Sequence, residues 1–587
     1  MATKKRPREN AGDSMSGRRA FLASAGVGLS AATAGCLREF RSAVNRTHLE
    51  QLSVSITTQP ADGDRQAIQI ARRLADNLEA VGIDVSVPLR SREEFLRDIL
   101  INHDFDIYVG RHPGASDPDF LYETLHSRYG EEAGWQNPFG YANTAVDDLL
   151  ETQRTADGDE RQEAVDGLLE AVAAEQPFVP ICRPTDVRLV RTDRFDGWRA
   201  DSLSTRLGYL DVERVGEANR LRGTVIDARV SKNLNPISAE YRGKDPLLDL
   251  LYDSLATREH DGTLIPWLAT DWDWDGDDLL VSLRRGHTFH DGEPVTADDV
   301  AFTYRFLEDT SLGSSDVPAP TPRYRGAVAA VDSVDVEGDH ELRIRLNTGE
   351  AVAQRVLTVP ILPRHRWEPR AEQATVRGVR IAKGTTEALI TDNVPPVGSG
   401  PFEFGDRAER EHLTLERFPD HFTARDDVSL PAASVDRLRA QIDPRSPSAI
   451  SLIETGDSDI TISPLEAYVY DDLEESEVKR VLETPSETFY HVGFNTRSAP
   501  FANPYVRRAV ARLIDKAWLV ETVFEGVAEP LATPVPDEWI PDSLAFDGVD
   551  PGVPFFGDDG DLDVSDARAA FESAGYRYDG DKLVVRE

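Results

Sequence analysis

The chain has 587 residues, more than a single hydrophobic core usually serves, so we expect two or more domains. Its 40% of apolar residues can form a buried core and argue against a disordered chain. The formal net charge of −39 argues against a nucleic-acid-binding protein, because phosphate contacts need basic patches. The two cysteines, Cys36 and Cys182, are too few for a disulfide framework or a cysteine-rich metal site.

The acidic residues are spread along the chain, in runs such as "TDWDWDGDD" and "YDDLEESE", and do not gather in one segment. Such a surface has two interpretations. It would attract a cationic ligand, or it would adapt the protein to high salt, where screening removes the self-repulsion of the carboxylates. The even spread favours the second interpretation, that of a halophilic, haloarchaeal-like protein.

The N-terminal segment "SGRRAFLASAGVGLSAATAGC" reads as an export signal. The pair Arg18 and Arg19 precedes a mildly apolar stretch that is too short and too rich in Gly and Ala to span a bilayer. "RRAFL" resembles a twin-arginine signal, and "TAGC" resembles a lipobox, in which Cys36 becomes lipidated.

We therefore expect a signal over residues 1–36, a tether over 37–47, and an exported protein held by a lipid at the outer face of the cytoplasmic membrane. Cleavage by a plain peptidase without a lipid is the alternative, because Thr33 stands where a lipobox usually has Leu.

From residue 51 the pattern alternates between strands and helices. "LSVSITT", "IDVSVPL" and "DFDIYVG" predict strands, while "DRQAIQIARRLADNLEAVG" and "SREEFLRDILI" predict helices. In the first helix Ile68, Leu74 and Leu78 share one face, and Gly82 ends the helix. These βαβ units predict a partly parallel sheet with a ligand crevice at the carboxyl ends of its strands.

Two amphipathic helices are predicted next, in "NTAVDDLLETQRT" and "DERQEAVDGLLEAVAAEQ", followed by a buried strand in "PFVPICRP". From about Leu221 short strands, aromatic residues and turns predict a larger mixed α/β domain. After Pro500 helical patterns return.

The stretch "LRRGHTFHDGEPVTADDVAFTYRFL", residues 283–307, is the most specific part of the sequence. It predicts a strand, a turn at Asp291, and a helix whose N-cap Thr296 has Asp299 three residues later. It closely resembles the signature of the family 5 extracellular solute-binding proteins, the peptide- and nickel-type receptors of ABC importers. "NLNPIS", "PVGSGPFEF", "ETGDSDITISP" and "FYHVGFNTRSAPFANPYVRRAVARLIDKAWLV" resemble further blocks of this family.

The order of these blocks departs from the family pattern. The part from "LEQLSVSITT" to "EQPFVPICRP" resembles the C-terminal third of the family but stands first here, and the chain ends at Glu587 where family members continue. We therefore expect a circular permutation, whose join at residues 214–222 links the usual C-terminus to the usual N-terminus. The strand predicted at Lys582–Arg586 should then lie roughly 5 Å, one strand spacing, from Leu52–Thr57.

The resemblance implies a two-lobed α/β fold of the periplasmic-binding-protein type (class II, large peptide-binding subtype), whose lobes close on a ligand about a hinge. Lobe I would span residues 190–495, with crossings near 190–220 and 490–496. Lobe II would combine residues 48–189 and 496–587.

The resemblance also implies the role of the protein: a monomer without enzymatic activity or cofactor, which captures an oligopeptide-like or related organic solute for an ABC permease. Two alternatives remain. One is a ligand-sensing or scaffold protein on the same fold without a permease. The other is an extracellular hydrolase, which is disfavoured because "HExxH" and "GxSxG" are absent from the sequence.

The loop "GRHPGASDPDF" is the first candidate for ligand contact. Asp117 and the proline after it match a pair in peptide-binding relatives, which carry, three residues earlier, an Asp that holds the peptide α-amine. Here Gly114 stands at that place, and a glycine cannot neutralise an ammonium, so a free-amine peptide is disfavoured. Arg111 is either an anion clamp or an exposed loop arginine. The other contacts that the resemblance implies are His112, Tyr141, Asn235, Ser399 and Ser463.

Two further groups could suggest binding sites. His287 and His290 are three apart, a spacing at which strand residues do not share a face, so we expect structural roles and no metal. Trp267, Trp272 and Trp274 surround a turn, and packing within the fold is the preferred interpretation over stacking on a ligand.

Overall fold

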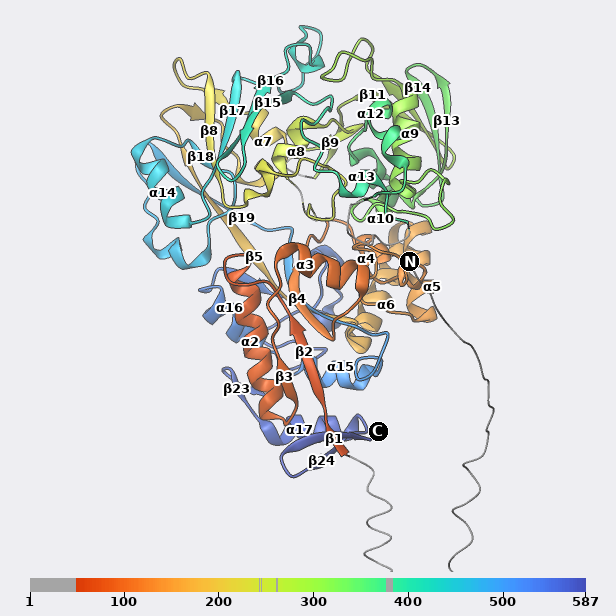
Figure 1. Ribbon diagram of the computed structural model, residues 1–587, viewed down its shortest axis with the longest axis vertical. Coiled ribbons are helices and arrows are strands. Elements are labelled where there is room, and N and C mark those ends of the chain that lie inside the picture. Colours follow the sequence, from red (N-terminus) through yellow and green to blue (C-terminus); the bar gives the residue numbers. More distant parts are fainter. Residues whose placement is uncertain (1–48, 242, 244, 260–261, 376–383, 587) are drawn as a thin grey trace, which may run out of the picture. The chain divides into compact units, whose positions relative to one another are not determined.

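The computed structural model describes residues 49–241, 243, 245–259, 262–375 and 384–586 (Figure 1). The expected signal and tether, with Arg18, Arg19 and Cys36, lie outside these residues. Residues Gln51–Val584 form one unit of the chain, to which the features below belong. In the described part of the chain, no helix has both the length and the apolar character needed to cross a membrane.

The largest sheet has the strand order β15-β16-β17-β8-β18-β5-β20-β4-β2-β3, and β19 and β21 also pair with β5. β5 (Phe178–Arg191) is antiparallel to all its neighbours: its first half pairs with β20 and β21, its second half with β18 and β19. The other strands are β2 (Ser53–Thr57), β3 (Asp84–Ser86), β4 (Ile107–His112), β8 (Arg220–Val225), β15 (Phe402–Ala408), β16 (His412–Arg417), β17 (Arg437–Ile442), β18 (Ile460–Thr461), β19 (Lys479–Pro485), β20 (Phe489–Phe494) and β21 (Ala528–Pro530).

The described residues contain two large hydrophobic cores, and we call the parts built on them lobe I and lobe II. The core of lobe I draws on residues from Val190 to Leu482. The core of lobe II draws on residues 95–178 and 489–544. The chain crosses from lobe II to lobe I along β5 and returns at residues 486–488, between β19 and β20. Because β20 pairs with β4 in lobe II, this return lies a few residues before the expected crossing at 490–496.

Lobe II contains the expected βαβ units. β2 pairs in parallel with β3 and β4, and the connections are α2 (Arg65–Ala80) and α3 (Arg92–Arg97). Asp64 caps α2 by accepting a hydrogen bond from the Ala67 N–H at 3.0 Å. Ile68, Leu74 and Leu78 are buried, as their helical spacing predicts. The remaining main helices of lobe II are α4 (Phe120–Leu125), α5 (Thr144–Thr155), α6 (Gly158–Glu175), α15 (Pro504–Ala511), α16 (Lys516–Val523) and α17 (Val564–Ser573).

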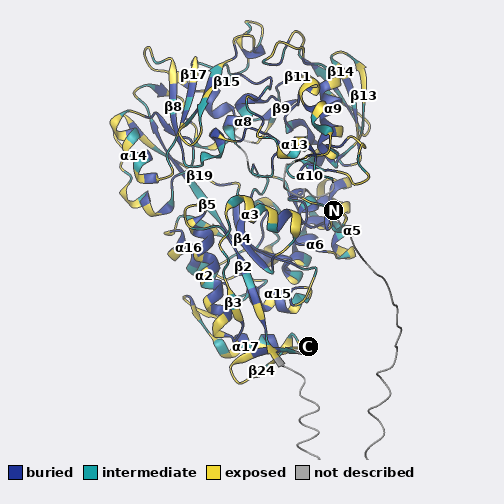
Figure 2. Ribbon diagram, in the orientation of Figure 1, coloured by how far each residue is buried: buried dark blue, intermediate teal, exposed yellow. Residues whose placement is uncertain are grey.

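Lobe I adds a second, antiparallel sheet of order β11-β12-β14-β13. The helix α9 (Ala297–Glu308) follows the expected turn, and Thr296 and Asp299 form the predicted capping box. Figure 2 shows the strands β4 and β5 largely buried and the outer sides of helices such as α14 exposed. The other elements of lobe I used below are β11 (Ala269–Asp275), β12 (Asp278–Leu283), β13 (Val331–Gly338), β14 (Glu341–Leu346), η4 (Ala228–Ser231), α8 (Pro246–Leu251), α10 (Arg325–Val328), α11 (Glu350–Ala353), η5 (Gln354–Thr358) and α14 (Ser446–Thr455).

Residues near the two ends of the described chain meet in lobe II. The Leu52 N–H donates to the Leu583 carbonyl at 2.8 Å, and the Leu583 N–H donates to the Gly82 carbonyl at 2.9 Å. Leu583 belongs to β25 (Lys582–Arg586), which pairs antiparallel with β24 (Arg577–Asp579). The expected proximity of Leu52 and the last strand is therefore found.

This packing generates a stability prediction at Gly82. Gly82 has φ +91, and an added Cβ would lie 2.0 Å from the Asp581 carbonyl oxygen. Gly82→Ala should therefore lower the free energy of unfolding, measured by denaturant titration, by about 3 kcal/mol. Gly575→Ala is the matched control: its φ is +99 but nothing lies within 4 Å of the added Cβ, so backbone strain alone should cost about 1 kcal/mol. Equal losses in the two variants would contradict the close approach of Asp581 to Gly82.

Candidate functional site

A cavity of about 1180 Å³ is lined by residues of both lobes. Lobe II contributes the segments that follow the carboxyl ends of β2 and β4, the place where a crevice was expected. Lobe I contributes residues around η4, α8 and Ser463, and both crossings between the lobes reach the wall, at Pro184–Asp186 and Thr484–Thr488. The wall carries arginines and carboxylates together with tyrosines, so it offers hydrogen bonds and charges of both signs.

Arg111, at the end of β4, is held by two neighbours in lobe II. Its Nε donates to Asp64 Oδ2 at 2.9 Å, and its guanidinium lies 4.9 Å from the centre of the Tyr490 ring. The Tyr490 hydroxyl donates to the other Asp64 oxygen at 3.0 Å. Burial alone would lower the pKa of Arg111, but Asp64 and Tyr490 raise it above its ordinary value. Arg111 is therefore a half-exposed cation whose charge Asp64 already compensates.

His112 and Gly114 shape the loop after β4. The Gly114 N–H donates to His112 Nδ1 at 3.0 Å, so His112 Nε2 carries the ring proton and faces the Thr124 hydroxyl at 3.2 Å. Gly114 has φ +59, and an added Cβ would lie 2.4 Å from the Glu487 carbonyl oxygen. The second crossing thus occupies the space that a side chain at position 114 would need.

Asp117 lines the cavity but is engaged within lobe II. Nη2 of Arg161 donates to its two carboxylate oxygens at 2.7 and 2.9 Å. Its Oδ1 also accepts a hydrogen bond from the Asp119 N–H at 2.8 Å. Asp117 therefore fixes the loop "ASDPDF" against α6, where Arg161 lies.

Ser463 also lines the cavity, and its hydroxyl accepts a hydrogen bond from the Ile226 N–H at 3.2 Å. Three other expected contacts do not reach the cavity wall. Asn235 is fully buried, and its amide donates to the carbonyls of Ala388 and Thr391 at 2.8 and 2.9 Å. Tyr141 lies in the core of lobe II, and Ser399 belongs to a buried cluster in lobe I. The family resemblance could not distinguish these interior positions from ligand contacts.

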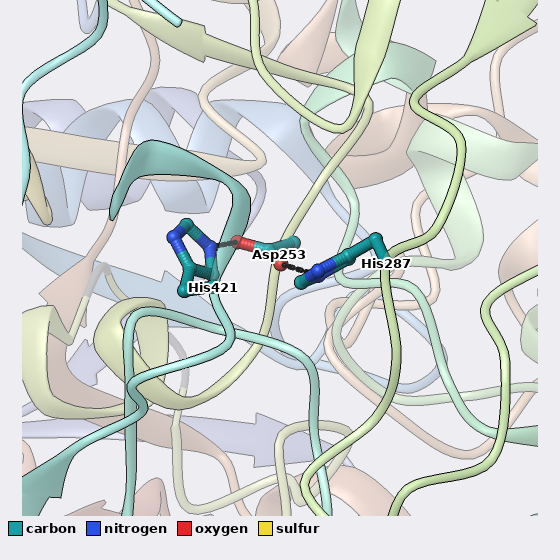
Figure 3. Close-up of side chains that lie close together, drawn as sticks. All are labelled: Asp253, His287 and His421. Carbon is teal, nitrogen blue, oxygen red and sulfur yellow. Dashed lines mark hydrogen bonds and ion pairs between the residues drawn. The ribbon is translucent and has the colours of Figure 1, made fainter. Parts of the chain in front are cut away.

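The buried cluster in lobe I is centred on the carboxylate of Asp253 (Figure 3). Its Oδ1 accepts hydrogen bonds from Trp267 Nε1 at 2.7 Å and Arg206 Nη1 at 3.1 Å, and its Oδ2 accepts one from the Ser399 hydroxyl at 2.9 Å. Two imidazoles face it from opposite sides: Nε2 of His287 lies 3.1 Å from Oδ2, and Nε2 of His421 lies 3.3 Å from Oδ1.

Both imidazoles act as donors to Asp253. Nδ1 of His421 accepts a hydrogen bond from the Thr423 N–H at 3.3 Å, which leaves the proton on Nε2. Nε2 of His287 faces two acceptors, the Asp253 carboxylate and the Ser399 carbonyl at 3.0 Å, so it must also carry a proton. Burial alone would raise the pKa of Asp253, but its contacts with the two histidines hold the pKa well below the ordinary value.

One possible ligand atom from each of Asp253, His287 and His421 lies within 4.8 Å of the other two, and this set of donors suits a transition metal. A cation there would lie beside the Arg206 guanidinium, and both Nε2 protons are already directed at oxygen acceptors. Hydrogen bonds and one buried ion pair therefore account for the cluster, which anchors segments far apart in the sequence of lobe I.

His290 and Trp267 have structural positions, as expected. Nδ1 of His290 accepts a hydrogen bond from the Gly398 N–H at 3.2 Å, and its Nε2 donates to the Gly400 carbonyl at 3.0 Å. His290 therefore holds the glycine-rich turn at residues 398–400. Trp267 is fully buried and donates to Asp253.

Sequence reasoning did not identify several residues of the cavity wall. Asp64 could have been read as the N-cap of the predicted helix, but nothing local indicated its contacts with Arg111 and Tyr490. Arg92 and Arg355 also line the cavity, and each contacts the lobe opposite its own. Such contacts join residues more than 100 positions apart, and composition and periodicity do not report them.

Residues 263–586, more than half of the chain, match the family model described as bacterial extracellular solute-binding proteins, family 5 Middle. Among curated proteins, the oligopeptide-binding protein AppA of Bacillus subtilis (strain 168) is 25% identical over 255 residues, which cover 42% of this chain and 41% of that protein. The di/tripeptide-binding protein 2 of Pseudomonas aeruginosa (strain UCBPP-PA14) is 27% identical over 301 residues, covering 49% and 53%. The chain thus spans about half the length of the curated relatives it matches.

The chain is also similar to a solved structure of the oligopeptide-binding protein AppA from Bacillus subtilis in complex with a nonapeptide. The match covers 63% of this chain and 66% of the AppA chain, with a TM-score of 0.44 and 18% sequence identity.

The buried histidines generate a prediction for acid pH. Burial lowers the pKa of His290 to about 4, and burial with the nearby Arg497 lowers that of His103 to about 4, from an ordinary value of 6.5. The unfolded chain therefore binds more protons than the folded protein below pH 6.5. Each such histidine should lower the free energy of unfolding by up to about 1.4 kcal/mol per pH unit as the pH falls from 6.5 towards 4.

Denaturant titrations between pH 7.5 and 4.5 check this prediction. His290→Gln keeps a donor for the Gly400 carbonyl but does not titrate, so its stability should decline less steeply below pH 6.5 than that of the unmodified protein. Above pH 7 the two curves should run parallel, which serves as the internal control. Equal slopes below pH 6.5 would contradict the lowered pKa of His290.

Proposed function

The chain belongs to the family 5 extracellular solute-binding proteins, and from that premise we propose that it is the substrate-binding lipoprotein of an ABC importer. It captures an organic solute, oligopeptide-like or related, in the cavity between its two lobes and presents the solute to a membrane permease. The family binds solutes and does not catalyse a reaction, so the cavity residues are assigned binding roles.

The observation that carries this proposal is the position of the cavity. Both lobes line it, and the chain passes between the lobes only twice in the described residues, along β5 and at residues 486–488. Two adjacent crossings suit a hinge, about which lobes can close on a ligand and open again. The lobe boundaries that we propose are therefore residues 184–186 and 486–488.

The size and the wall of the cavity favour a polar solute larger than most drug-sized ligands. The cavity volume of about 1180 Å³ exceeds the range of about 300–1,000 Å³ that is typical of pockets for such ligands. Arg111, His112, Gly114, Asp117 and Ser463 are the proposed contacts, because they line the wall. Since Gly114 offers no carboxylate and has no room for one, we propose that the solute is not held there by a free amine.

The proposed cellular setting rests on the sequence. Arg18 and Arg19 would direct twin-arginine export, and Cys36 would carry the lipid that holds the protein at the outer face of the membrane. The permease is the proposed partner, and the protein is proposed to act as a monomer. The net charge of −39 supports adaptation to high salt.

We also propose that the chain order is a circular permutation of the family order. The sequence blocks support it, since the part resembling the family's C-terminal third precedes the matched residues 263–586. The hydrogen bonds of Leu583 with Leu52 and Gly82 support it, because they place the last strand beside the first. The proposed join at residues 214–222 is mostly exposed, where a new connection is tolerated.

The first test of the binding role is the retention of solute. The full chain, purified in high salt and examined by native mass spectrometry, should carry a small organic molecule that is released on denaturation. Arg417→Ala, in an exposed ion pair of lobe I that does not line the cavity, is the control and should retain the same molecule. A protein that carries no solute and is not stabilised against heat by any member of a peptide and organic-solute library would contradict the proposal.

The second test concerns the amine. Alanine tripeptide with a free amine should bind no tighter than the same peptide with an acetylated N-terminus, because no carboxylate occupies position 114. Isothermal titration calorimetry with the two peptides measures the difference. Micromolar binding of free di- or tripeptides, lost on acetylation, would show that another carboxylate holds the amine.

A further inference from the structure

Two groups of contacts between lobe I and lobe II differ in burial. We call the first group the buried junction: Asp119 and Arg154 of lobe II with Arg355 and Gly349 of lobe I. We call the second group the exposed row: the pairs Arg92–Asp227, Glu93–Lys232 and Arg65–Glu466, of which the first residue belongs to lobe II and the second to lobe I.

The buried junction is centred on a carboxylate without access to solvent. Asp119 is 1% exposed, and its Oδ2 accepts a hydrogen bond from Arg355 Nη1 at 2.6 Å. Its Oδ1 lies 3.0 Å from Arg154 Nε and accepts a hydrogen bond from the Gln153 amide at 2.9 Å. The Gly349 N–H donates to the Arg154 carbonyl at 2.7 Å, so a backbone hydrogen bond also joins the lobes. Removing one partner from such a buried pair is strongly destabilising, because the other charge is left buried without compensation.

Apolar packing continues the buried junction along lobe I. Ala239 and Ala329 of lobe I pack against the hydrophobic core of lobe II. The indole of Trp135, in lobe II, donates to the Ala239 carbonyl at 3.0 Å. The boundary between the two groups lies at the next residue, Glu240, whose carbonyl accepts a hydrogen bond from Arg92 at 3.3 Å.

The exposed row consists of ion pairs in contact with solvent. Arg92 Nη1 lies 3.1 Å from Asp227 Oδ2, and the two side chains are 38% and 35% exposed. The pairs Glu93–Lys232 and Arg65–Glu466 are longer, at 3.8 Å each, and are also open to solvent. Exposed pairs of this kind contribute little to stability, because water screens their charges.

Asp227 also has a second partner within its own lobe. Nη2 of Arg229 lies 3.2 Å from the same Oδ2 that contacts Arg92. When Arg92 leaves, Asp227 therefore keeps a guanidinium beside it, and no unpaired carboxylate is created. This arrangement makes the contact with Arg92 easy to break and to form again.

We propose that the cleft opens along the exposed row while the buried junction stays closed and serves, with the two crossings, as the pivot. This inference rests on the proposed closing of the lobes and identifies which contacts move. Arg92 is the residue that holds the closed state on the opening side, because it contacts both Asp227 and the Glu240 carbonyl. Arg355 is the residue that holds the pivot.

Distances between spin labels test the proposal in the full chain carrying Cys36→Ser, whose remaining cysteine, Cys182, is buried. One pair of labels, Arg97→Cys and Glu409→Cys, reports on the exposed row. Arg97 lies in α3, the helix that carries Arg92 and Glu93. Glu409 lies near Lys232, because the N–H of the next residue, Arg410, donates to the Ser231 hydroxyl. The other pair, Asp148→Cys and Glu350→Cys, reports on the buried junction from α5 and α11.

Arg92→Ala should shift the distance across the exposed row to longer values and leave the distance across the buried junction unchanged. Arg355→Ala should lengthen the distance across the junction. Arg417→Ala, which removes an exposed pair within lobe I, should change neither. The proposal is overturned if Arg92→Ala lengthens both distances or neither, or if Arg355→Ala leaves the junction distance unchanged. This measurement needs no solute. A result that overturns the proposed pivot would therefore leave the binding role untouched, and that role is tested separately by the retention of solute.

Discussion

One continuous strand, β5, belongs to the sheet of both lobes, and the position of the cavity depends on it. Its first half is paired with β20 and β21 of lobe II, and its second half with β18 and β19 of lobe I. The partners change at Pro184 and Thr185, where the strand passes the cavity wall. Because each half is fixed by hydrogen bonds to its own lobe, relative motion of the lobes must be absorbed where the partners change.

The interior of each lobe is organised around carboxylates that arginines neutralise. Asp253 meets Arg206 in lobe I, Asp119 meets Arg154 and Arg355 at the junction, and the buried Asp459 meets Arg222 at 2.8 Å. In a chain with so few lysines, arginine supplies these contacts, and its planar donors reach several acceptors at once. These three carboxylates are thus buried beside a guanidinium, whereas Asp550 is buried beside the ammonium of Lys516.

Local features of the fold could be predicted from the sequence. The βαβ units, the cap at Thr296 and the buried face of α2 follow from periodicity and capping chemistry, which act within a few residues. The candidate site could be predicted only in part. The loop after β4 lines the cavity, but Asn235 and Ser399 turn inward to satisfy buried carbonyl and carboxylate groups. A loop sequence does not reveal which side its polar side chains face, because that depends on partners distant in the chain.

Gly114 shows how such a distant partner changes the meaning of a residue. In the sequence, a glycine in place of a carboxylate suggested a choice of ligand. In the structure, the Glu487 carbonyl, 373 positions further along the chain, lies where its Cβ would be. The glycine is therefore required by the contact between the loop after β4 and the second crossing. The absence of a carboxylate at this place follows from that contact, so any selectivity for the proposed solute must come from the other residues of the wall.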